Sequence, residues 1–293
     1  MAELWSLFVD TPWIAYSVVA ILGLCVGSFL NVVIHRLPLM MQQGWRQECQ
    51  LFLHPEQPVT PEPPLTLSTP ASRCPQCGHL IRWYENIPVI SWLALRGKCS
   101  ACKTPISIRY PLVEMGTMLA SILVLMTFGA TAQLWAALGF TWVLIALIGI
   151  DFDHQLLPDS LTLPLAGAGL LANAHHLFVS PTQAIWGYVL GFLALWIVYI
   201  TYKIVTGKEG MGFGDFKLLA ALGAWLGPSM LPLIILLSSV LGAVIGVILM
   251  RIKKESQPFA FGPYLAIAGF IALLWGQQIV TGYLEYAKVS PTP

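Results

Sequence analysis

The chain has 293 residues, of which 57% are hydrophobic and only 10% are charged, whereas ordinary soluble domains carry about 25% charged residues. Its formal net charge of +1 gives no sign of a nucleic-acid partner. Long apolar runs recur along the chain, each near the ~20 residues that a helix needs to cross a bilayer. The composition therefore predicts an all-α, multi-spanning membrane protein.

About eight membrane spans are predicted. The sixth is short, and with the seventh it could form one re-entrant or tilted hairpin divided at Gly227-Pro228. The first span is expected to be retained, because it is not preceded by the Lys or Arg residues of a signal peptide. The spans cover approximately residues 13–34, 112–128, 133–150, 160–178, 184–202, 216–228, 230–250 and 262–280.

The basic residues predict the orientation of these spans. With the N-terminus outside the cytoplasm, 14 of the 15 Lys and Arg residues fall on the cytoplasmic side and only Lys288 falls outside. A bias of this size sets the topology by the positive-inside rule. Both ends of the chain are then extracytoplasmic, and residues 35–111, 151–159 and 210–217 are cytoplasmic.

Residues 35–111 form the sizeable polar segment of the chain. Its first half is rich in Pro and is expected to be an irregular linker. Two CxxC motifs follow, Cys74 with Cys77 and Cys99 with Cys102, separated by 21 residues, one more than the usual 15–20. Two such turns can complete a tetrahedral four-sulfur zinc site, which has no open position and is structural. Two disulfides are the alternative, and a reducing cytoplasm disfavours them.

Three acids follow the apolar run that ends at Ile150. A carboxylate this close to the hydrocarbon is costly, so it is a functional candidate by default. Asp159 precedes an apolar helix and is expected to be its N-cap. Asp153 is expected to lie solvated in the turn. Asp151 lies nearest the membrane and is the best candidate of the three.

Another acid, Asp215, stands in the segment GMGFGDFK at 210–217, which has three glycines at alternate positions. Glycine allows positive φ and close backbone approach. A carboxylate stabilised by a helix dipole would explain the acid but not the glycines. Two carboxylates from different helices suit an aspartic protease, in which the pair holds one proton. One acid then takes a proton from water, and the other donates to the scissile carbonyl.

Two other classes of function remain compatible with these residues. A proton-coupled transporter would use Asp151 and Asp215 as relay groups and would show ion flux without cleavage. A noncatalytic assembly scaffold would use the zinc loop for docking, and would tolerate Asp→Asn changes at both sites.

Taken together, the motifs resemble the bacterial type IV prepilin peptidases, GxGD-type aspartic proteases of the inner membrane. The long form with paired CxxC motifs is similar to enzymes that also methylate their product. The resemblance covers nearly the whole chain. It is carried by GSFLNVVIHRLP at 27–38, the CxxC pairs at 74–77 and 99–102, RYPLVE at 109–114, DFDHQLLPDSLTLP at 151–164, GMGFGDFKLLAALGAWLG at 210–227 and FGPYLAIAG at 261–269.

The resemblance implies a function and its site. Asp151 and Asp215 match the family's catalytic aspartates. The enzyme would remove the basic leader of prepilins and of type II secretion pseudopilins at the cytoplasmic membrane face. It would then N-methylate the new terminal amine with S-adenosylmethionine.

Three parts are expected from this resemblance. Residues 1–34 would form the first transmembrane helix, 35–111 the cytoplasmic zinc loop and 112–293 the peptidase core, with both termini periplasmic and membrane lipid around the spans. The residues that bind the methyl donor are not identified, since no strand followed by GxGxxG marks a nucleotide site.

Overall fold

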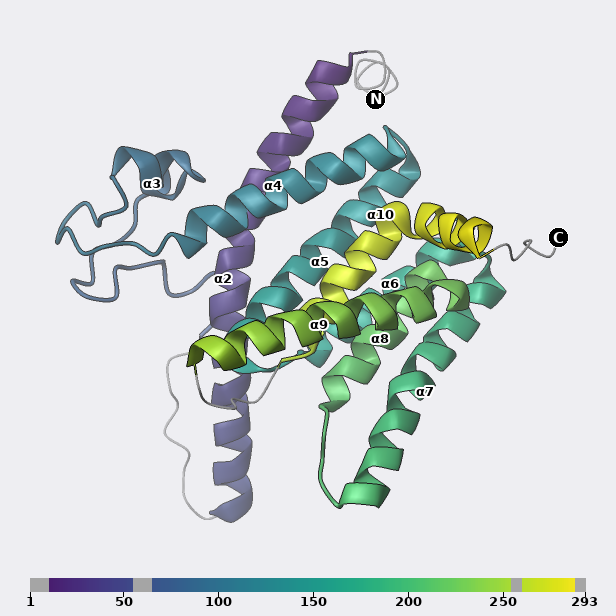
Figure 1. The fold of residues 1–293 in the computed structure, drawn as a ribbon. Coiled ribbons are helices and arrows are strands. Elements are labelled where there is room, and N and C mark those ends of the chain that lie inside the picture. Colours follow the sequence, from purple (N-terminus) through teal and green to yellow (C-terminus); the bar gives the residue numbers. More distant parts are fainter. Residues whose placement is uncertain (1–10, 55–64, 254–259, 288–293) are drawn as a thin grey trace. The chain divides into compact units, whose positions relative to one another are not determined.

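The structure is a computed structural model, and it describes residues 11–54, 65–253 and 260–287. Its regular elements within these ranges are all helices (Figure 1), which confirms the predicted all-α class. The chain divides into two compact units, Met1–Met126 and Thr127–Pro293. Both chain ends, residues 55–64 of the Pro-rich segment, and Lys254 and Lys288 from the charge argument lie outside the described residues.

The first unit is built on two long helices that cross closely. A Cβ added to Gly23 would lie 2.8 Å from the Cα of Met118, and one added to Gly27 would lie 2.7 Å from the Cα of Glu114. Small residues four apart let helix backbones approach in this way. The helices of this unit are α2 (Pro12–Leu53), the 3-10 helix η1 (Trp83–Asn86), α3 (Ile90–Ala94) and α4 (Arg109–Phe128).

Helix α2 continues past residue 34, where the sequence predicts the end of the first span. It ends at Leu53 and carries Pro38 inside it. Residues 35–53 are rich in Leu, Met, Gln and Arg, which have high helix propensity. The helix therefore extends beyond the apolar run, and the prediction of an irregular linker is wrong for residues 35–53.

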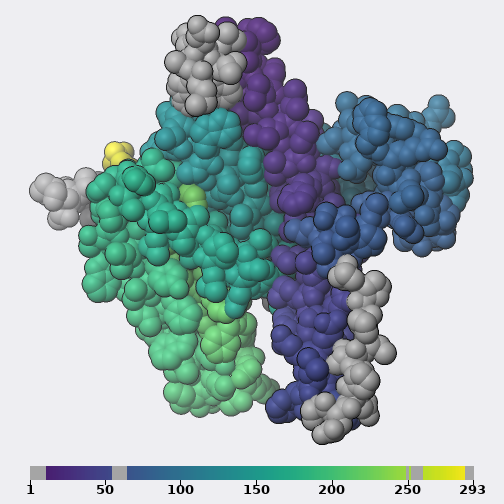
Figure 2. Space-filling view, turned by 180° about the vertical axis from the view of Figure 1, so that it is seen from behind, coloured from purple at the N-terminus to yellow at the C-terminus, as the bar shows by residue number. Residues whose placement is uncertain are grey.

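The segment between α2 and α4 is tied to both helices. Arg36 on α2 donates from Nη1 to the carbonyl of Thr66 at 3.0 Å and from Nη2 to that of Pro70 at 2.8 Å. Glu114 on α4 is buried and accepts the backbone N–H of Val89 at 2.7 Å. Residues 65–108 of this segment form a rounded body, drawn in blue in Figure 2.

The second unit surrounds one short, buried helix. Helix α8 packs against α6, α7 and α10, and nearly all its residues from Asp215 onwards are buried. A helix that is apolar on all sides lies either in a protein core or in a membrane, and here neighbouring helices cover it. The helices of this unit are α5 (Ala132–His154), α6 (Asp159–Ala174), α7 (Pro181–Thr206), α8 (Phe213–Leu226), η2 (Pro228–Met230), α9 (Leu231–Lys253) and α10 (Gly262–Tyr286).

Glycines allow α7 and α8 to lie side by side with their backbones in contact (Figure 1). A Cβ on Gly187 would lie 2.1 Å from the carbonyl oxygen of Gly223, and one on Gly191 would lie 2.6 Å from that of Leu219. No larger residue fits at either glycine without moving the helices apart. This contact fixes the axis of α8, and with it the position of Asp215.

Six helices of the described chain are long and apolar enough to cross a membrane. Helices α6 and α8 have only 16 and 14 residues, so the predicted count of eight spans is not confirmed. The predicted division at Gly227-Pro228 is confirmed, because α8 ends at Leu226 and Gly227 has a φ of 78°. The six candidates are Pro12–Leu53, Arg109–Phe128, Ala132–His154, Pro181–Thr206, Pro228–Ile248 and Gly262–Tyr286.

Candidate functional site

Asp151 lies in the last turn of α5 and is only 4% exposed. The first residue of α10, Gly262, donates its backbone N–H to the Asp151 carboxylate. A Cβ at Gly262 would lie 2.5 Å from Oδ2 of Asp151, so the contact requires glycine. The start of α10 therefore holds this carboxylate in place.

Asp215 lies in the first turn of α8 and is 8% exposed. Its carboxylate accepts the backbone N–H of Gly212, the N-cap residue of α8. It also lies near enough to Asp151 for the two carboxylates to interact electrostatically. The structure thus brings together the two acids that the sequence singles out, from the end of one helix and the start of another.

One buried leucine connects the surroundings of the two acids. A Cβ on Gly214 would lie 2.7 Å from Cβ of Leu157, and one on Gly262 would lie 2.9 Å from Cδ1 of Leu157. Leu157 is 9% exposed and stands in the turn that follows α5. Sequence reasoning missed Leu157 and Gly262, although FGP at 261–263 was part of the resemblance.

Aromatic side chains and an ion pair hold the segment that leads into α8. The rings of Tyr199, Phe213 and Phe216 pack with centroids 5.4 to 5.5 Å apart. Lys203 on α7 donates to the carboxylate of Glu209 at 2.7 Å. These contacts anchor the glycine-containing segment to the end of α7.

The two other acids of the 151–159 segment have different surroundings. Asp153 is exposed, as predicted, but it lies in the last turn of helix α5 and not in the turn that follows. The prediction that Asp159 is a helix N-cap is wrong, because Pro158 occupies the N-cap position and Asp159 is the first residue of α6. Its carboxylate accepts two hydrogen bonds of 2.7 Å from Nζ of Lys217 instead.

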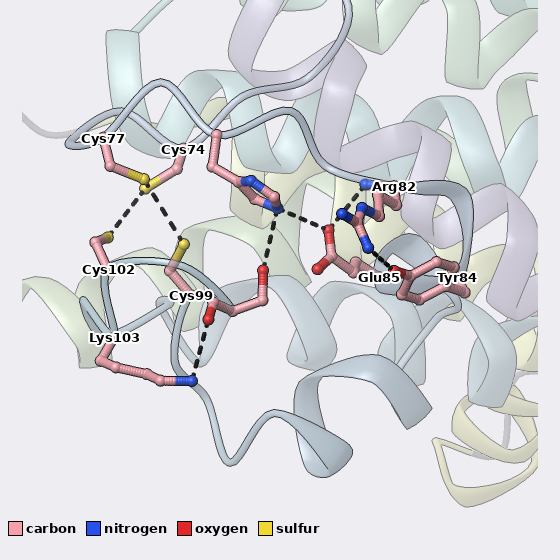
Figure 3. Close-up of polar contacts among 10 residues, drawn as sticks. Cys74, Cys77, Arg82, Tyr84, Glu85, Cys99, Cys102 and Lys103 are labelled. Atoms are coloured by element: carbon pink, nitrogen blue, oxygen red, sulfur yellow. Dashed lines mark hydrogen bonds and ion pairs between the residues drawn. The ribbon is translucent and has the colours of Figure 1, made fainter.

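The four cysteines of the CxxC motifs converge in the first unit (Figure 3). Their sulfurs all lie within 4.8 Å of one another, with Cys74 to Cys102 at 3.7 Å and Cys77 to Cys99 at 4.0 Å. A tetrahedral site with Zn–S bonds of about 2.3 Å has sulfurs about 3.8 Å apart, whereas a disulfide needs about 2.05 Å. The cluster could therefore bind a metal, and its spacing is that of a four-thiolate site rather than of two disulfides.

The two cysteine turns are built alike, 25 residues apart. Arg73 forms an isolated β-bridge with Leu80, and Lys98 forms one with Pro105. The residue after the second cysteine of each motif, Gly78 or Lys103, has a positive φ, 70° and 61°. The repeated turn explains why both pairs of thiols point at one centre.

These features define a multi-pass helical membrane protein with a pair of buried acids in one unit and, in the other, a four-cysteine cluster that could bind a metal. Residues 21–128 match the bacterial peptidase A24 N-terminal domain, and residues 138–247 match the type IV leader peptidase family. The chain belongs to the type IV leader peptidase family.

Curated relatives match over nearly their whole length. The protein from Stutzerimonas stutzeri is 59% identical over 92% of this chain and 93% of its own. The protein from Aeromonas hydrophila is 54% identical over 97% of this chain and 99% of its own. The protein from Pseudomonas aeruginosa is 56% identical over 91% of this chain and 92% of its own. All three are named prepilin leader peptidase/N-methyltransferase. No solved structure matches the chain.

Proposed function

We propose that this protein cleaves the leader from prepilins and pseudopilins, and then N-methylates the new terminal residue. The observation that carries the proposal is the pair of buried, mutually interacting carboxylates of Asp151 and Asp215. The names of the full-length relatives support both activities. The transporter alternative has no support among these relatives.

The two carboxylates would act as an aspartic protease pair. Such a pair holds one proton, because ionising both acids at short range is costly. The ionised acid takes a proton from a water molecule, and the water oxygen attacks the scissile carbonyl carbon. The protonated acid donates to the carbonyl oxygen, which gives a tetrahedral intermediate. The proton taken from water then passes to the amide nitrogen and the C–N bond breaks. The second acid recovers its proton as the carbonyl re-forms at the new carboxyl end of the leader. The N–H groups of Gly262 and Gly212 orient the two acids during these steps.

The second activity needs a methyl donor. When bound, S-adenosylmethionine would supply a methyl group on a sulfonium sulfur, and the new amine would form the N–C bond while the S–C bond breaks and a proton passes to water. The residues of this chain must therefore hold a cationic nucleoside and admit a peptide amine.

The sequence also supports proposals for the metal, the location in the membrane and the roles of three parts of the chain. Zinc is the metal we propose for the four cysteines, since an all-thiolate tetrahedral set suits it. The protein would lie in the bacterial inner membrane, with both termini periplasmic and the acids at the cytoplasmic face. We further propose that residues 1–34 anchor the chain in lipid, that 35–111 carry the metal, and that 112–293 perform the cleavage.

Mass spectrometry of a purified prepilin incubated with this protein in detergent and S-adenosylmethionine tests the proposal. The wild type should remove the leader and add one methyl group. Asp151→Asn and Asp215→Asn should leave the prepilin intact. Asp153→Asn is the matched control, because Asp153 is exposed two residues from Asp151, and it should cleave like wild type. Cleavage by Asp151→Asn or Asp215→Asn would remove that residue from the mechanism.

A further inference from the structure

A cavity of about 460 Å³ lies beside the cysteine cluster in the first unit. Its volume is within the range of about 300–1,000 Å³ that small-molecule sites occupy. One wall is polar, with Arg82, Tyr84, Glu85 and Ser100, and another is apolar, with Ala94 and Leu95 from the end of α3. Figure 3 shows Glu85, Arg82 and Tyr84 grouped together, apart from the four sulfurs.

Glu85 supplies a fixed negative charge to this cavity. Its side chain is only 9% exposed, and its carboxylate accepts the backbone N–H of Arg82 at 2.9 Å. That N–H, together with the hydroxyl of Ser100 and the ring of His79, lowers the pKa of Glu85 to about 2. The acid is therefore ionised at neutral pH, and a partly buried carboxylate of this kind favours a cationic partner.

Arg82 and Tyr84 give the same cavity a cation and an aromatic face. The guanidinium of Arg82 donates to the hydroxyl of Tyr84 and lies 5.8 Å from the centre of its ring. Both side chains are exposed, so a ligand can reach them. An exposed guanidinium pairs readily with a carboxylate, since its donors match the two oxygens.

The metal does not account for these charges. Four thiolates fill a tetrahedral site, so none of the polar cavity residues is needed as a ligand. Ser100, which follows Cys99, contacts His79 and Glu85 and so links the two cysteine turns, but a structural link requires neither an adjacent cavity nor an exposed guanidinium. The set of anion, cation, aromatic ring and apolar wall is one that binds a zwitterionic nucleoside.

We propose that this cavity is the binding site for the methyl donor, S-adenosylmethionine. The carboxylate of Glu85 faces the positive charge of the ligand, Arg82 binds its carboxylate, and Tyr84 with the apolar wall of Ala94 and Leu95 contacts the adenine. The inference rests on the methyltransferase part of the proposed function and adds the location of its donor site.

Binding of tritium-labelled S-adenosylmethionine to the purified full-length protein, measured by equilibrium dialysis, tests the site without relying on turnover. Ala94→Phe fills the cavity and should weaken binding at least tenfold, and Glu85→Gln should weaken it similarly. Leu93→Phe is the matched control, because Leu93 is the preceding residue of α3, is 62% exposed and does not line the cavity. It should bind like wild type, and all variants should keep one metal per chain.

A second measurement does not depend on any variant. Ultraviolet cross-linking of the labelled donor to the wild-type protein should mark peptides within residues 79–101. Labelling confined to residues 127–293, or unchanged binding by a metal-loaded Ala94→Phe, would overturn the site. Either result would leave methylation by the wild type intact, whereas cleavage without any methylation by the wild type would refute the methyltransferase function itself.

Discussion

Lys217 donates to both carboxylate oxygens of Asp159 at 2.7 Å, joining the first turn of α8 to the first residue of α6. The two side chains are 31% and 55% exposed, so the pair adds little to global stability. Its position matters more, because Lys217 stands two residues after Asp215. The ion pair therefore links the start of α6 to the helix that carries Asp215.

Breaking this pair should slow cleavage without unfolding the protein. Lys217→Ala and Asp159→Ala should each lower kcat by about three- to tenfold, with a small change in Tm. The exchange variant Asp159→Lys with Lys217→Asp should recover part of the loss, measured as a coupling energy in a double-mutant cycle. Additive losses in that cycle would show that the two residues act separately.

Gly262→Ala should inactivate the peptidase. The new Cβ would lie 2.5 Å from Oδ2 of Asp151, so the carboxylate must move, and a displacement of about 1 Å can cost about 100-fold in rate. Gly282→Ala on the same helix is the control, since no atom lies within 4 Å of the added carbon. The rate of leader removal compares the two, and equal rates would argue against a positioning role for Gly262.

A substitution at Leu157 should distinguish the role of the contact at Gly214 from that of the contact at Gly262. The three atoms nearest to a Cβ on Gly214 all belong to Leu157. Leu157→Gly removes all three of these atoms, Cβ included, and should therefore restore part of the cleavage lost in Gly214→Ala. It should not restore Gly262→Ala, because the clash with Asp151 remains. Rescue of both variants would mean that Leu157 alone sets the geometry.

Removing the metal should unfold the segment between α2 and α4. Cys99 is buried, and Cys99→Ser should lose the metal, measured by elemental mass spectrometry, and expose the segment to proteases. Cys49→Ser is the matched control, because Cys49 lies outside the four-sulfur cluster. A protease-resistant Cys99→Ser protein without metal would contradict a structural role for the site.

The pair between Lys203 and Glu209 predicts a pH dependence. The ammonium of Lys203 holds the pKa of Glu209 below its usual range, so the anchoring contact is complete at neutral pH. Its contribution is present above the unfolded pKa of about 4.3 and is lost as the pH falls through the lower folded value. Glu209→Gln should thus reduce Tm by the same small amount between pH 6 and 8, and by less below pH 4. An effect that grows on acidification would contradict this sign.

The sequence was sufficient for the helical class, the four cysteines and the two acids, because each depends on local spacing or on apolar runs. It was insufficient for α8, since an apolar run of 14 residues does not reveal whether lipid or protein surrounds it. The contact of Gly262 with Asp151 joins residues more than a hundred positions apart and has no local signal. The helical path of residues 35–53 was hidden by the polar composition that suggested a loop.

At 1.5 Å per residue, the 14 residues of α8 span about 21 Å, less than the ~30 Å of a hydrocarbon core. Its end is closed by Asn173 of α6, whose Nδ2 donates to the carbonyls of Ala224 and Trp225 at 2.8 and 3.0 Å. Backbone carbonyls that lack a hydrogen-bond partner in lipid cost free energy. During biogenesis, α8 is therefore poorly suited to leave the translocon alone, and its insertion depends on α6 having already entered the bilayer.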